Sequence, residues 1–393
     1  MPYAVSAIGN IESAAAATVR VSGEKRALTG LRGVAACLVM LYHFTSGRIG
    51  GPIVQHGYMA VDLFFVLSGY VMALTYGAAF LTRGGWGTYQ DFLGRRLARI
   101  YPLYLLMTLV MAMLAYGGVI DTGEHVSLLS EMANLILIQA WGIGASFNPA
   151  AWSISTEWAA YLSFPVLAAV FLRTSPRAGL MLGLASIVLL ACLSLVPDGL
   201  RGSNAASLGR TVGPLNISDG GTPWPLLRCL IEFGLGLLTW RLTQWPSFAQ
   251  AARTVAPTMA IIAVIGLLAV HGSDVLLVVA FIPLVGLLSF EHSFAAKILA
   301  WRPVHWLGDA SYAIYLLHWV MIACIGPLSA ILTRSGVPHG WTISVGIMSG
   351  VTVAASSALY IWFEKPAKLF ARRLVQLCHP ITLGSEAQPT FRA

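Results

Sequence analysis

Long runs of apolar residues, each about as long as a membrane helix, dominate this sequence of 393 residues. A helix needs about 20 predominantly apolar residues to cross the hydrocarbon core of a bilayer. About ten stretches qualify, near residues 29–47, 58–82, 101–120, 154–172, 179–197, 226–241, 255–271, 274–290, 306–332 and 341–362. The pattern predicts an all-α fold, a polytopic transmembrane helix bundle of about ten spans.

The composition agrees with lipid as the main solvent. The chain is 57% hydrophobic and 10% charged, whereas soluble domains carry roughly 25% charged residues. The net charge of +8 comes from Lys and Arg in short groups between apolar stretches, which is the pattern of topology signals. We therefore expect a lipid bilayer as partner and no nucleic acid. The 5 cysteines show no metal spacing or C-x-x-C pair, so neither a metal site nor a disulfide framework is predicted.

One further stretch, residues 128–145, is ambiguous because Glu131, Asn134 and Gln139 interrupt it. If it spanned the membrane, Arg173, Arg177 and the later basic clusters would lie on the wrong side by the positive-inside rule. A re-entrant segment between spans three and four leaves most of the 24 Lys and Arg residues in the cytoplasm. Irregular backbone at membrane depth needs protein or a wet cavity around it, so residues 121–153 are predicted to line a cavity open to the outside.

The same rule predicts a multi-pass protein with both termini in the cytoplasm. Residues 1–27 are polar and Ala-rich and lack the apolar core of a signal peptide, so a disordered cytoplasmic tail is expected. Residues 28–368 form a single predicted transmembrane domain, and residues 369–393 a basic cytoplasmic tail. The loop from Pro197 to Pro225 is rich in Gly, Ser and Asn and is predicted to be a flexible outer lid.

Ionisable residues inside membrane spans are expensive and usually functional. Arg32 and His43 lie eleven residues apart in the first span. That spacing places both on one helix face, about 16 Å apart along the axis. The alternative is that Arg32 reaches the inner headgroups and His43 is a buried, hydrogen-bonded histidine.

Two carboxylates are candidates to act on His43. Asp62 lies at the outer end of the second span, in V-D-L-F-F-V-L-S-G-Y, and Glu157 lies just inside the fourth. A carboxylate beside an imidazole fixes its tautomer and raises its basicity, as a general base requires. Within the same second-span segment, Ser68 and Gly69 are interpreted as allowing close helix packing.

Further polar residues lie at both mouths of the bundle. Trp152, Ser153 and Ser155 of A-W-S-I-S-T-E-W are placed at the outer mouth, although an interfacial Trp is also a common membrane anchor. On the inner side, Arg96 and Arg99 present two guanidinium groups on one face at a helix start. Such groups suit phosphate oxygens, and positive-inside anchoring is the alternative.

The later spans carry three more polar groups. Arg228 and Glu232 are four residues apart in the sixth span and are expected to neutralise one another. Tyr315 and His318 lie near mid-membrane in the ninth span, where His318 is expected to pack and hydrogen-bond. The spacing from His305 to Asp309 matches a motif of soluble acyltransferases. We discount it, because one match among 9 histidines is unremarkable and this one lies at the cytoplasmic edge.

Taken together, these segments resemble the bacterial acyltransferase-3 family of membrane O-acyltransferases, over residues 28–368. The shared features are Arg-x10-His, D-L-F-F-V-L-S-G, R-x-x-R-I-Y-P, W-S-x-S-x-E, L-G-x-x-S-Y-x-x-Y-L-x-H and a terminal E-x-P at Glu364 and Pro366. Each motif alone is weak, but six in the right order at the right depth are specific.

The resemblance implies ten spans, a re-entrant loop and a place in the bacterial inner membrane. It implies that acyl-CoA, usually acetyl-CoA, enters from the cytoplasm as co-substrate and that no cofactor is bound. It also implies that Arg32 and His43 are essential, that Arg96 and Arg99 hold the CoA phosphates, and that a glycan or glycolipid hydroxyl is the acceptor. Because the chain ends soon after the tenth predicted span, transfer is expected within the membrane domain.

We therefore expect His43, oriented by Asp62 or Glu157, to remove the proton of a sugar hydroxyl that attacks the thioester. Trp152, Ser153, Ser155, Tyr315 and His318 are acceptor-side or structural candidates. A secondary transporter is the alternative, because it also carries intramembrane His, Asp and Arg. Transporters usually show inverted repeats and helices broken by Gly or Pro, and neither is evident. The sequence does not indicate an oligomeric state or a particular acceptor.

Overall fold

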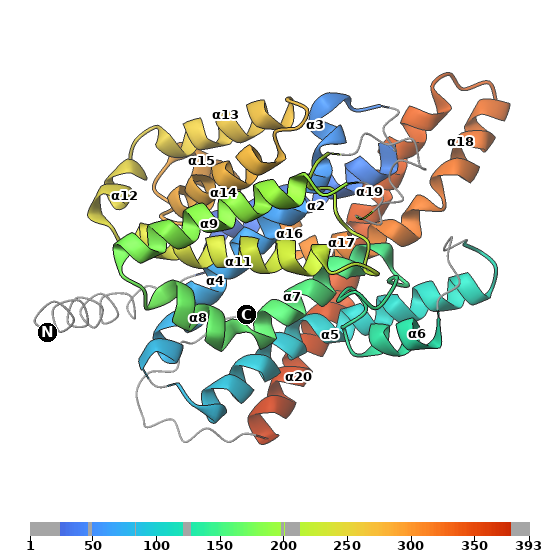
Figure 1. Ribbon diagram of the computed structural model, residues 1–393. Helices are drawn as coiled ribbons and strands as arrows, with labels where there is room; N and C mark the ends of the chain where they lie inside the picture. The colour runs from blue at the N-terminus through green and yellow to red at the C-terminus, as the bar shows by residue number, and fades with distance from the viewer. Residues whose placement is uncertain are drawn as a thin grey trace, which may run out of the picture.

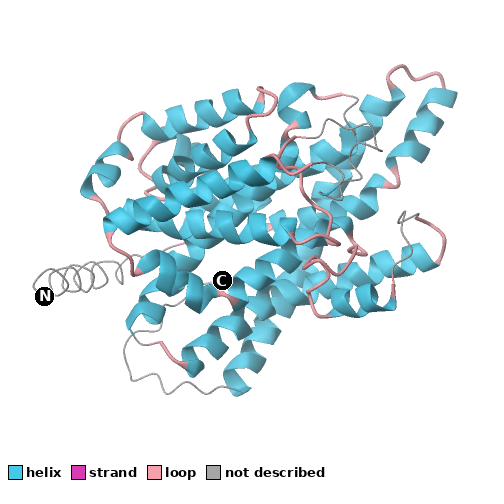
Figure 2. Ribbon diagram, viewed as in Figure 1, coloured by secondary structure: helices cyan, strands magenta, loops and turns pink. Residues whose placement is uncertain are grey.

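The computed structural model describes residues 24–378, apart from residues 46–48, 83, 121–126, 198–199 and 201–212. Every regular element in these residues is a helix (Figure 1, Figure 2). The all-α prediction is therefore confirmed for the described part of the chain. Residues 1–23 of the predicted N-terminal tail and residues 198–199 and 201–212 of the predicted outer lid lie outside the described residues.

Five helices are long and apolar enough to cross a membrane. They are α2 (Arg26–Thr45), α4 (Ala60–Thr82) with the 3-10 turn η1 (Gly57–Met59) before it, α5 (Trp86–Tyr116), α9 (Pro176–Ser194) and α19 (Gly340–Leu359). The helix α19 continues through a π-helical turn, η3 (Tyr360–Glu364), into α20 (Lys365–Cys378). This last helix runs past the domain boundary predicted at residue 368.

Two further apolar segments are sharply bent. The helices α7 (Trp152–Leu162) and α8 (Phe164–Leu172) meet at 67°, and α17 (Ser311–Ile322) and α18 (Ile325–Arg334) meet at 52°. Pro165 and Pro327 follow the two breaks. A proline cannot donate to the carbonyl four residues earlier and its ring clashes with that turn. With each bent pair taken as one span, up to seven helical segments qualify.

Three other predicted spans are helical but fall short in length or apolarity. The helix α11 (Trp224–Thr243) is long but carries Arg228, Glu232 and Arg241, whereas α13 (Ala256–Leu268) and α14 (Asp274–Leu288) are shorter. The chain is a multi-pass membrane protein with several apolar helices, and the count of ten spans stays a prediction.

The ambiguous stretch does not form a spanning helix. It forms an 8-residue helix, α6 (Leu128–Leu135), followed by turns up to the 3-10 helix η2 (Pro149–Ala151). Asn134 and Gln139 are fully buried there. The other short helices are α3 (Gly51–Gln55), α12 (Pro246–Ala251), α15 (Phe294–Leu299) and α16 (Arg302–Asp309).

The helix α11 lies at the centre of the bundle and packs against α4, α7, α8, α9 and α14. Its contact with α4 is at backbone distance. A Cβ atom at Gly69 would lie 2.0 Å from the carbonyl oxygen of Phe233, and one at Gly236 would lie 2.1 Å from that of Val66. Small residues at such crossings allow membrane helices to approach closely, as predicted for Gly69.

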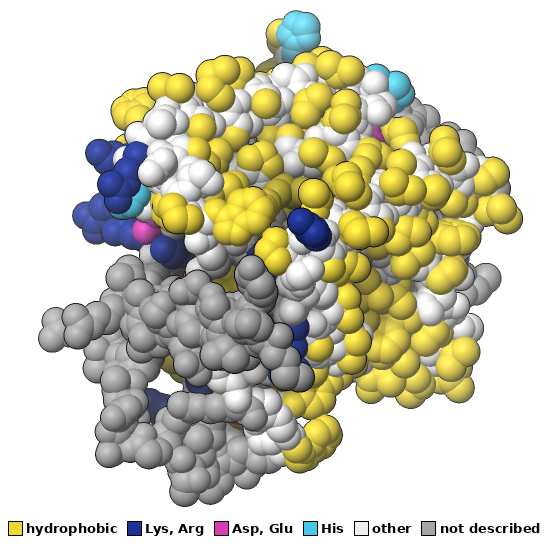
Figure 3. Space-filling view, turned by 60° about the vertical axis from the view of Figure 1, so that its left-hand side comes forward, with side chains coloured by type: hydrophobic (Ala, Val, Ile, Leu, Met, Phe, Trp, Pro, Cys, Tyr) yellow, Lys and Arg dark blue, Asp and Glu magenta, His cyan; other side chains and the backbone are white. Residues whose placement is uncertain are grey.

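The helix α2 packs against α4, α16 and α17, and α20 packs against α5 (Figure 1). The contact with α20 involves the first half of α5, where Gly94 faces Val375, and the charge of Arg32 in α2 acts on Lys368 of α20. The outer wall is apolar, with exposed side chains such as Met113, Leu180 and Ile262. In Figure 3, hydrophobic side chains cover the upper and right-hand surface, whereas most visible Lys and Arg side chains lie to the left.

Candidate active site

The R-x-x-R motif lies well inside a helix rather than at its start, because α5 begins at Trp86. Arg96 is buried, with 6% of its surface exposed. Its Nη2 atom donates to the Tyr76 hydroxyl at 3.0 Å, and the guanidinium carbon lies 5.2 Å from the Tyr76 ring centroid. The Nε atom of Arg96 has no hydrogen-bond partner among the described residues. A buried donor without a partner is costly, so this group is suited to an anion that arrives as ligand.

Four more cations lie near Arg96 and complete the inner cation cluster, defined here as Arg32, Arg96, Arg99, Lys368 and Arg372. The charges of Arg99, Glu157 and Glu364 act on Arg32, and those of Arg96 and Arg99 act on Arg372. Arg32 and Arg99 make no hydrogen bond or ion pair within the described ranges. The cluster therefore brings together the three arginines predicted from sequence and adds two cations from α20.

The carboxylate of Glu364 acts as a counter-ion for this cluster, because its charge acts on Arg32 and Lys368. It is buried at 6% exposure, and its Oε2 atom has no hydrogen-bond partner in the part of the chain that the structure describes. It is also the last residue of the π-helical turn η3. Such turns occur often at functional sites. From the sequence, Glu364 stands only in the terminal E-x-P motif, and no role was predicted for it.

Glu157 lies further along the bundle and is hydrogen-bonded on its own helix and to α4. Its Oε1 atom accepts from the Ser68 and Tyr161 hydroxyls, both at 2.5 Å. Ser68 therefore binds a carboxylate, in contrast to the packing role preferred from sequence. The charge of Glu157 acts on both Arg32 and Tyr315. Glu157 therefore lies within electrostatic range of the inner cation cluster, which contains Arg32, and of the predicted outer residues, which include Tyr315.

Asp62 binds Arg228 of α11, whereas the sequence predicted that it would act on His43 of α2. The guanidinium Nε donates to Asp62 Oδ1 at 2.9 Å, and Nη2 binds Asp62 Oδ2. Arg228 Nε lies 3.6 Å from Glu232 Oε1, and neither oxygen of Glu232 has a hydrogen-bond partner among the described residues. The pairing of Arg228 with Glu232 is thus secondary to its bidentate bond with Asp62. The structure joins neither Asp62 nor Glu157 to His43 by a hydrogen bond or ion pair between described residues.

His43 lies in the last turn of α2 and meets His318 of α17. The Nε2 atom of His318 is 3.3 Å from the Nδ1 atom of His43, and this nitrogen is also 3.0 Å from the Val39 carbonyl oxygen. The His318 side chain is fully buried, whereas His43 is half-buried. We call these two residues the outer histidine pair.

The remaining predicted outer residues lie beside this pair. The Tyr315 ring is 5.9 Å from that of His318, and its hydroxyl is 2.8 Å from Ser153 Oγ. Next to Ser153, the Trp152 ring lies 5.6 Å from the guanidinium carbon of Arg228, a cation–π contact. The structure therefore brings Trp152, Ser153, Tyr315 and the histidine pair into one region.

Ser155 is directed elsewhere. Its hydroxyl donates to the Leu137 carbonyl at 2.9 Å and accepts from the Ala140 amide at 3.2 Å. Leu137 has a left-handed backbone with φ of 63°, which is uncommon for a side chain of this size. Ser155 thus fixes the irregular segment that follows α6. Asn148 fixes its far end by donating to the Leu316 carbonyl at 2.9 Å.

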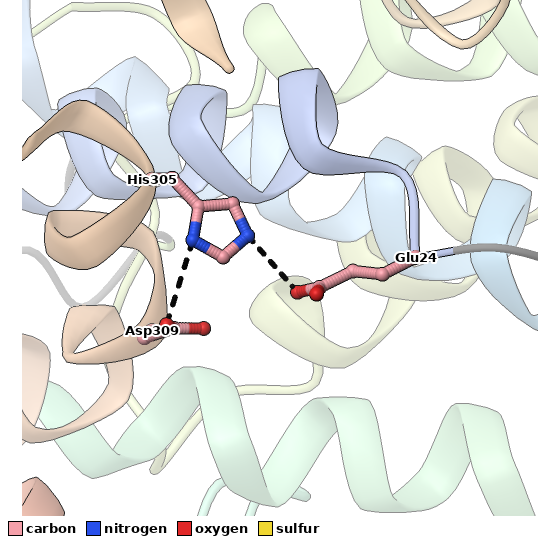
Figure 4. A group of neighbouring side chains, drawn as sticks. All are labelled: Glu24, His305 and Asp309. Atoms are coloured by element: carbon pink, nitrogen blue, oxygen red, sulfur yellow. Dashed lines mark hydrogen bonds and ion pairs between the residues drawn. The ribbon is translucent and has the colours of Figure 1, made fainter. Parts of the chain in front are cut away.

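His305 lies beside Glu24 and Asp309, and donor atoms of all three lie within 4.8 Å of one another (Figure 4). The Nε2 atom is 3.2 Å from Glu24 and the Nδ1 atom is 3.5 Å from Asp309. The two carboxylates thus approach opposite ring nitrogens, which suits an ion-paired histidine better than a chelate. Glu24 precedes α2 and His43 lies in its last turn, so this group and the outer histidine pair lie at opposite ends of that helix.

A second buried polar group holds the described end of the outer loop. Asp274 Oδ2 accepts from the Tyr58 hydroxyl at 2.9 Å and the Leu215 amide at 2.8 Å, and its Oδ1 lies 3.6 Å from His56 Nε2. This interaction with Asp274 raises the pKa of His56. Leu215 and Ile217 are fully buried, so this stretch of the predicted lid is packed into the bundle.

A family model described as an acyltransferase domain matches residues 25–361. The chain belongs to this acyltransferase family. No solved structure matches it. A relative named putative peptidoglycan O-acetyltransferase YrhL, from Bacillus subtilis (strain 168), is 26% identical over 381 residues. The match covers 88% of this chain and 56% of the relative, so the acyltransferase spans about half the length of that protein.

Two other relatives match over most of their own length. Acyltransferase MdmB from Streptomyces mycarofaciens is 26% identical over 393 residues, which cover 93% of this chain and 97% of the relative. Exopolysaccharide production protein ExoZ from Rhizobium meliloti (strain 1021) is 25% identical over 341 residues, which cover 83% and 90%. The acyltransferase domain thus includes α2, α5 and α17, the helices that carry the outer histidine pair and most of the inner cation cluster.

Proposed function

We propose that this acyltransferase moves an acyl group, normally acetyl, from cytoplasmic acyl-CoA to a hydroxyl of a cell-surface or exported glycan. Family membership and relatives named for peptidoglycan O-acetylation and exopolysaccharide production support the reaction class. The observation that carries the proposal is that one helix, α2, contributes Arg32 to the inner cation cluster and His43 to the outer histidine pair.

The inner cation cluster is the donor site. Three phosphate groups make the head of CoA strongly anionic, and guanidinium forks bind such oxygens in charge-assisted pairs. Arg32 and Arg99 make no hydrogen bond in the described residues, and one donor each of Arg96 and Arg372 has none. Anionic phosphates would satisfy these groups. The positive-inside rule puts this end of α2 in the cytoplasm, where acyl-CoA is made.

His43 is the general base at the far end of the same helix. Eleven residues of α-helix separate it from Arg32 by about 16 Å, a distance that the thin pantetheine arm of CoA is built to bridge. As the acceptor oxygen attacks the thioester carbonyl carbon, His43 removes the hydroxyl proton. The carbon–sulfur bond then breaks, and the imidazolium returns the proton to the leaving thiolate. The products are the ester and free CoA, with His43 neutral again.

The acceptor enters from the opposite side of the membrane. The irregular segment after α6, held by Ser155 and Asn148, forms the outer mouth together with Trp152 and Ser153. In this orientation both termini are cytoplasmic, the segment is re-entrant, and the protein has ten spans in the bacterial inner membrane. A sugar hydroxyl of a polysaccharide, peptidoglycan or glycolipid meets the requirements, because each presents alcohols at the outer surface.

The decisive experiment combines biochemistry and glycan analysis. Purified protein in proteoliposomes receives acetyl-CoA with an isotope-labelled acetyl group and the exported glycan fraction of the host. We expect release of CoA and labelled acetyl esters on the glycan by mass spectrometry. The host without the gene should lose the same esters, and His43→Gln should not restore them. Unchanged glycans in the deletion strain, with no CoA released by the pure protein, would refute the proposal.

A further inference from the structure

The outer histidine pair has an arrangement of hydrogen-bonding groups that fixes one proton. A carbonyl oxygen can only accept, so the nitrogen that lies 3.0 Å from the Val39 carbonyl, Nδ1 of His43, must carry a hydrogen. In a neutral imidazole the other nitrogen, Nε2, is then the basic one. The same Nδ1 lies 3.3 Å from Nε2 of His318, which must therefore be an acceptor.

We propose that His318 is the positioning residue that holds the His43 imidazole in its Nδ1–H tautomer and stabilises the imidazolium formed during acyl transfer. This inference rests on the proposed function, in which His43 is the base. It assigns to a neutral imidazole the part that a carboxylate plays in hydrolytic triads. The two carboxylates expected from sequence bind Arg228 and the Ser68–Tyr161 pair instead.

The surroundings of His318 suit a positioning role. Its side chain has no exposed surface, and rings of Phe44, Tyr315 and Trp319 lie 6.4, 5.9 and 6.0 Å from it. These aromatic rings enclose the imidazole. His43 is only half-buried, so substrate can approach it, whereas His318 is shielded from substrate. His318 therefore acts through His43 rather than on the reacting atoms.

The proton movement is balanced within the pair. When His43 Nε2 takes the hydroxyl proton, its Nδ1–H remains in place and gains strength as a donor to Val39 O and His318 Nε2, because charge-assisted hydrogen bonds are stronger. His318 neither gains nor loses a proton. When the thiolate leaves, the Nε2 proton passes to sulfur and the pair returns to its starting state.

The variants separate hydrogen bonding from packing. His318→Leu keeps much of the volume and removes the acceptor, whereas His318→Gln places an amide near the Nε2 position. Phe44→Leu is the matched control, because Phe44 packs on His318 without a hydrogen bond. Acetyl transfer from acetyl-CoA to the host glycan fraction is measured against pH in proteoliposomes, with acetyl-CoA affinity and thermal stability measured on the same samples.

We expect His318→Leu to lower kcat about tenfold to a hundredfold, the range seen when hydrogen-bond partners of metal-bound histidines are removed, with acetyl-CoA affinity unchanged. The acid limb of its pH profile should move to lower pH, because the imidazolium is less stabilised. His318→Gln should recover most of the rate, and Phe44→Leu should keep the wild-type profile. Coincident profiles for wild type and a folded His318→Leu would overturn the inference.

A second measurement does not depend on acyl transfer. Nitrogen NMR of isotope-labelled histidine in the wild-type protein, with the His43 signal assigned through His43→Gln, reports which nitrogen carries the hydrogen. We expect Nδ1–H in wild type; an Nε2–H tautomer would overturn the inference. If the wild-type protein transfers no acyl group but shows Nδ1–H, the proposed function fails while the assignment of the proton stands.

Discussion

Replacing Arg228 with methionine would leave two buried carboxylates, Asp62 and Glu232, with no cation between them. Both carboxylates have no exposed surface, and Arg228 is 1% exposed. Removing one partner of a buried ion pair costs about 3–5 kcal/mol, so we expect Arg228→Met to lie in that range. Asp62→Asn should cost less, about 1–3 kcal/mol, because Arg228 keeps Glu232, whose nearest oxygen is 3.6 Å away.

The assay is reversible unfolding in mixed micelles, followed by tryptophan fluorescence. Arg241→Met is the control, since Arg241 hydrogen-bonds Thr174 and the Phe171 carbonyl from a half-buried position and has no carboxylate partner among the described residues. It should cost less than Arg228→Met. Adding Asp62→Asn and Glu232→Gln to Arg228→Met should restore stability, because it removes the unpaired charges. If Asp62→Asn were as destabilising as Arg228→Met, the account of one cation shared by two carboxylates would be refuted.

Four other predictions follow from topology, the donor site, the base and pH. A reporter fused after Arg177 should lie in the cytoplasm and one fused near residue 123 outside; a periplasmic signal after Arg177 would contradict the re-entrant segment. Replacing Arg96 or Arg99 with Ala should weaken acetyl-CoA binding about tenfold or more, measured by calorimetry; unchanged affinity in both would leave them a topological role only. His43→Gln should lower turnover about 10²–10⁴-fold with acetyl-CoA binding retained, and near-normal turnover would exclude it as the base. The wild-type protein should be more thermally stable than His56→Gln, and this difference should be largest below pH about 6.5. The difference should vanish as the pH rises through the raised pKa of His56 in the folded protein. A stability difference that grew with pH would contradict the interaction of His56 with Asp274.

Much of the helical framework could be predicted because hydropathy acts locally. Apolar runs of sufficient length marked α2, α4, α9 and α19 with boundaries within a few residues of those observed. The breaks before α8 and α18 were missed, although Pro165 and Pro327 supplied a local signal. The start of α5 was also missed, because the apolar run that predicted this span begins at residue 101, whereas the helix begins at Trp86 with polar turns.

The partners of the polar residues could not be predicted in the same way. Sequence spacing pairs Arg228 with Glu232 along one helix, but tertiary packing gives Arg228 a bidentate partner, Asp62, from α4. Likewise, the contact between His43 and His318 depends on how α2 packs against α17. The residue types indicated that Arg228, Asp62, His43 and His318 are functional candidates. Which of them pair depends on how helices that are far apart in the sequence are rotated against one another.

The π-helical turn at Tyr360–Glu364 determines the rotational phase of the final helix. Each residue of an α-helix advances the azimuth by about 100°, and a π-helical turn accommodates an extra residue without breaking the rod. Removing one residue from this turn would rotate α20 by about that angle relative to α19. Lys368 and Arg372 would then leave the side of the helix that faces α5. The composition of the inner cation cluster thus depends on the length of a five-residue turn as well as on the residues that form it.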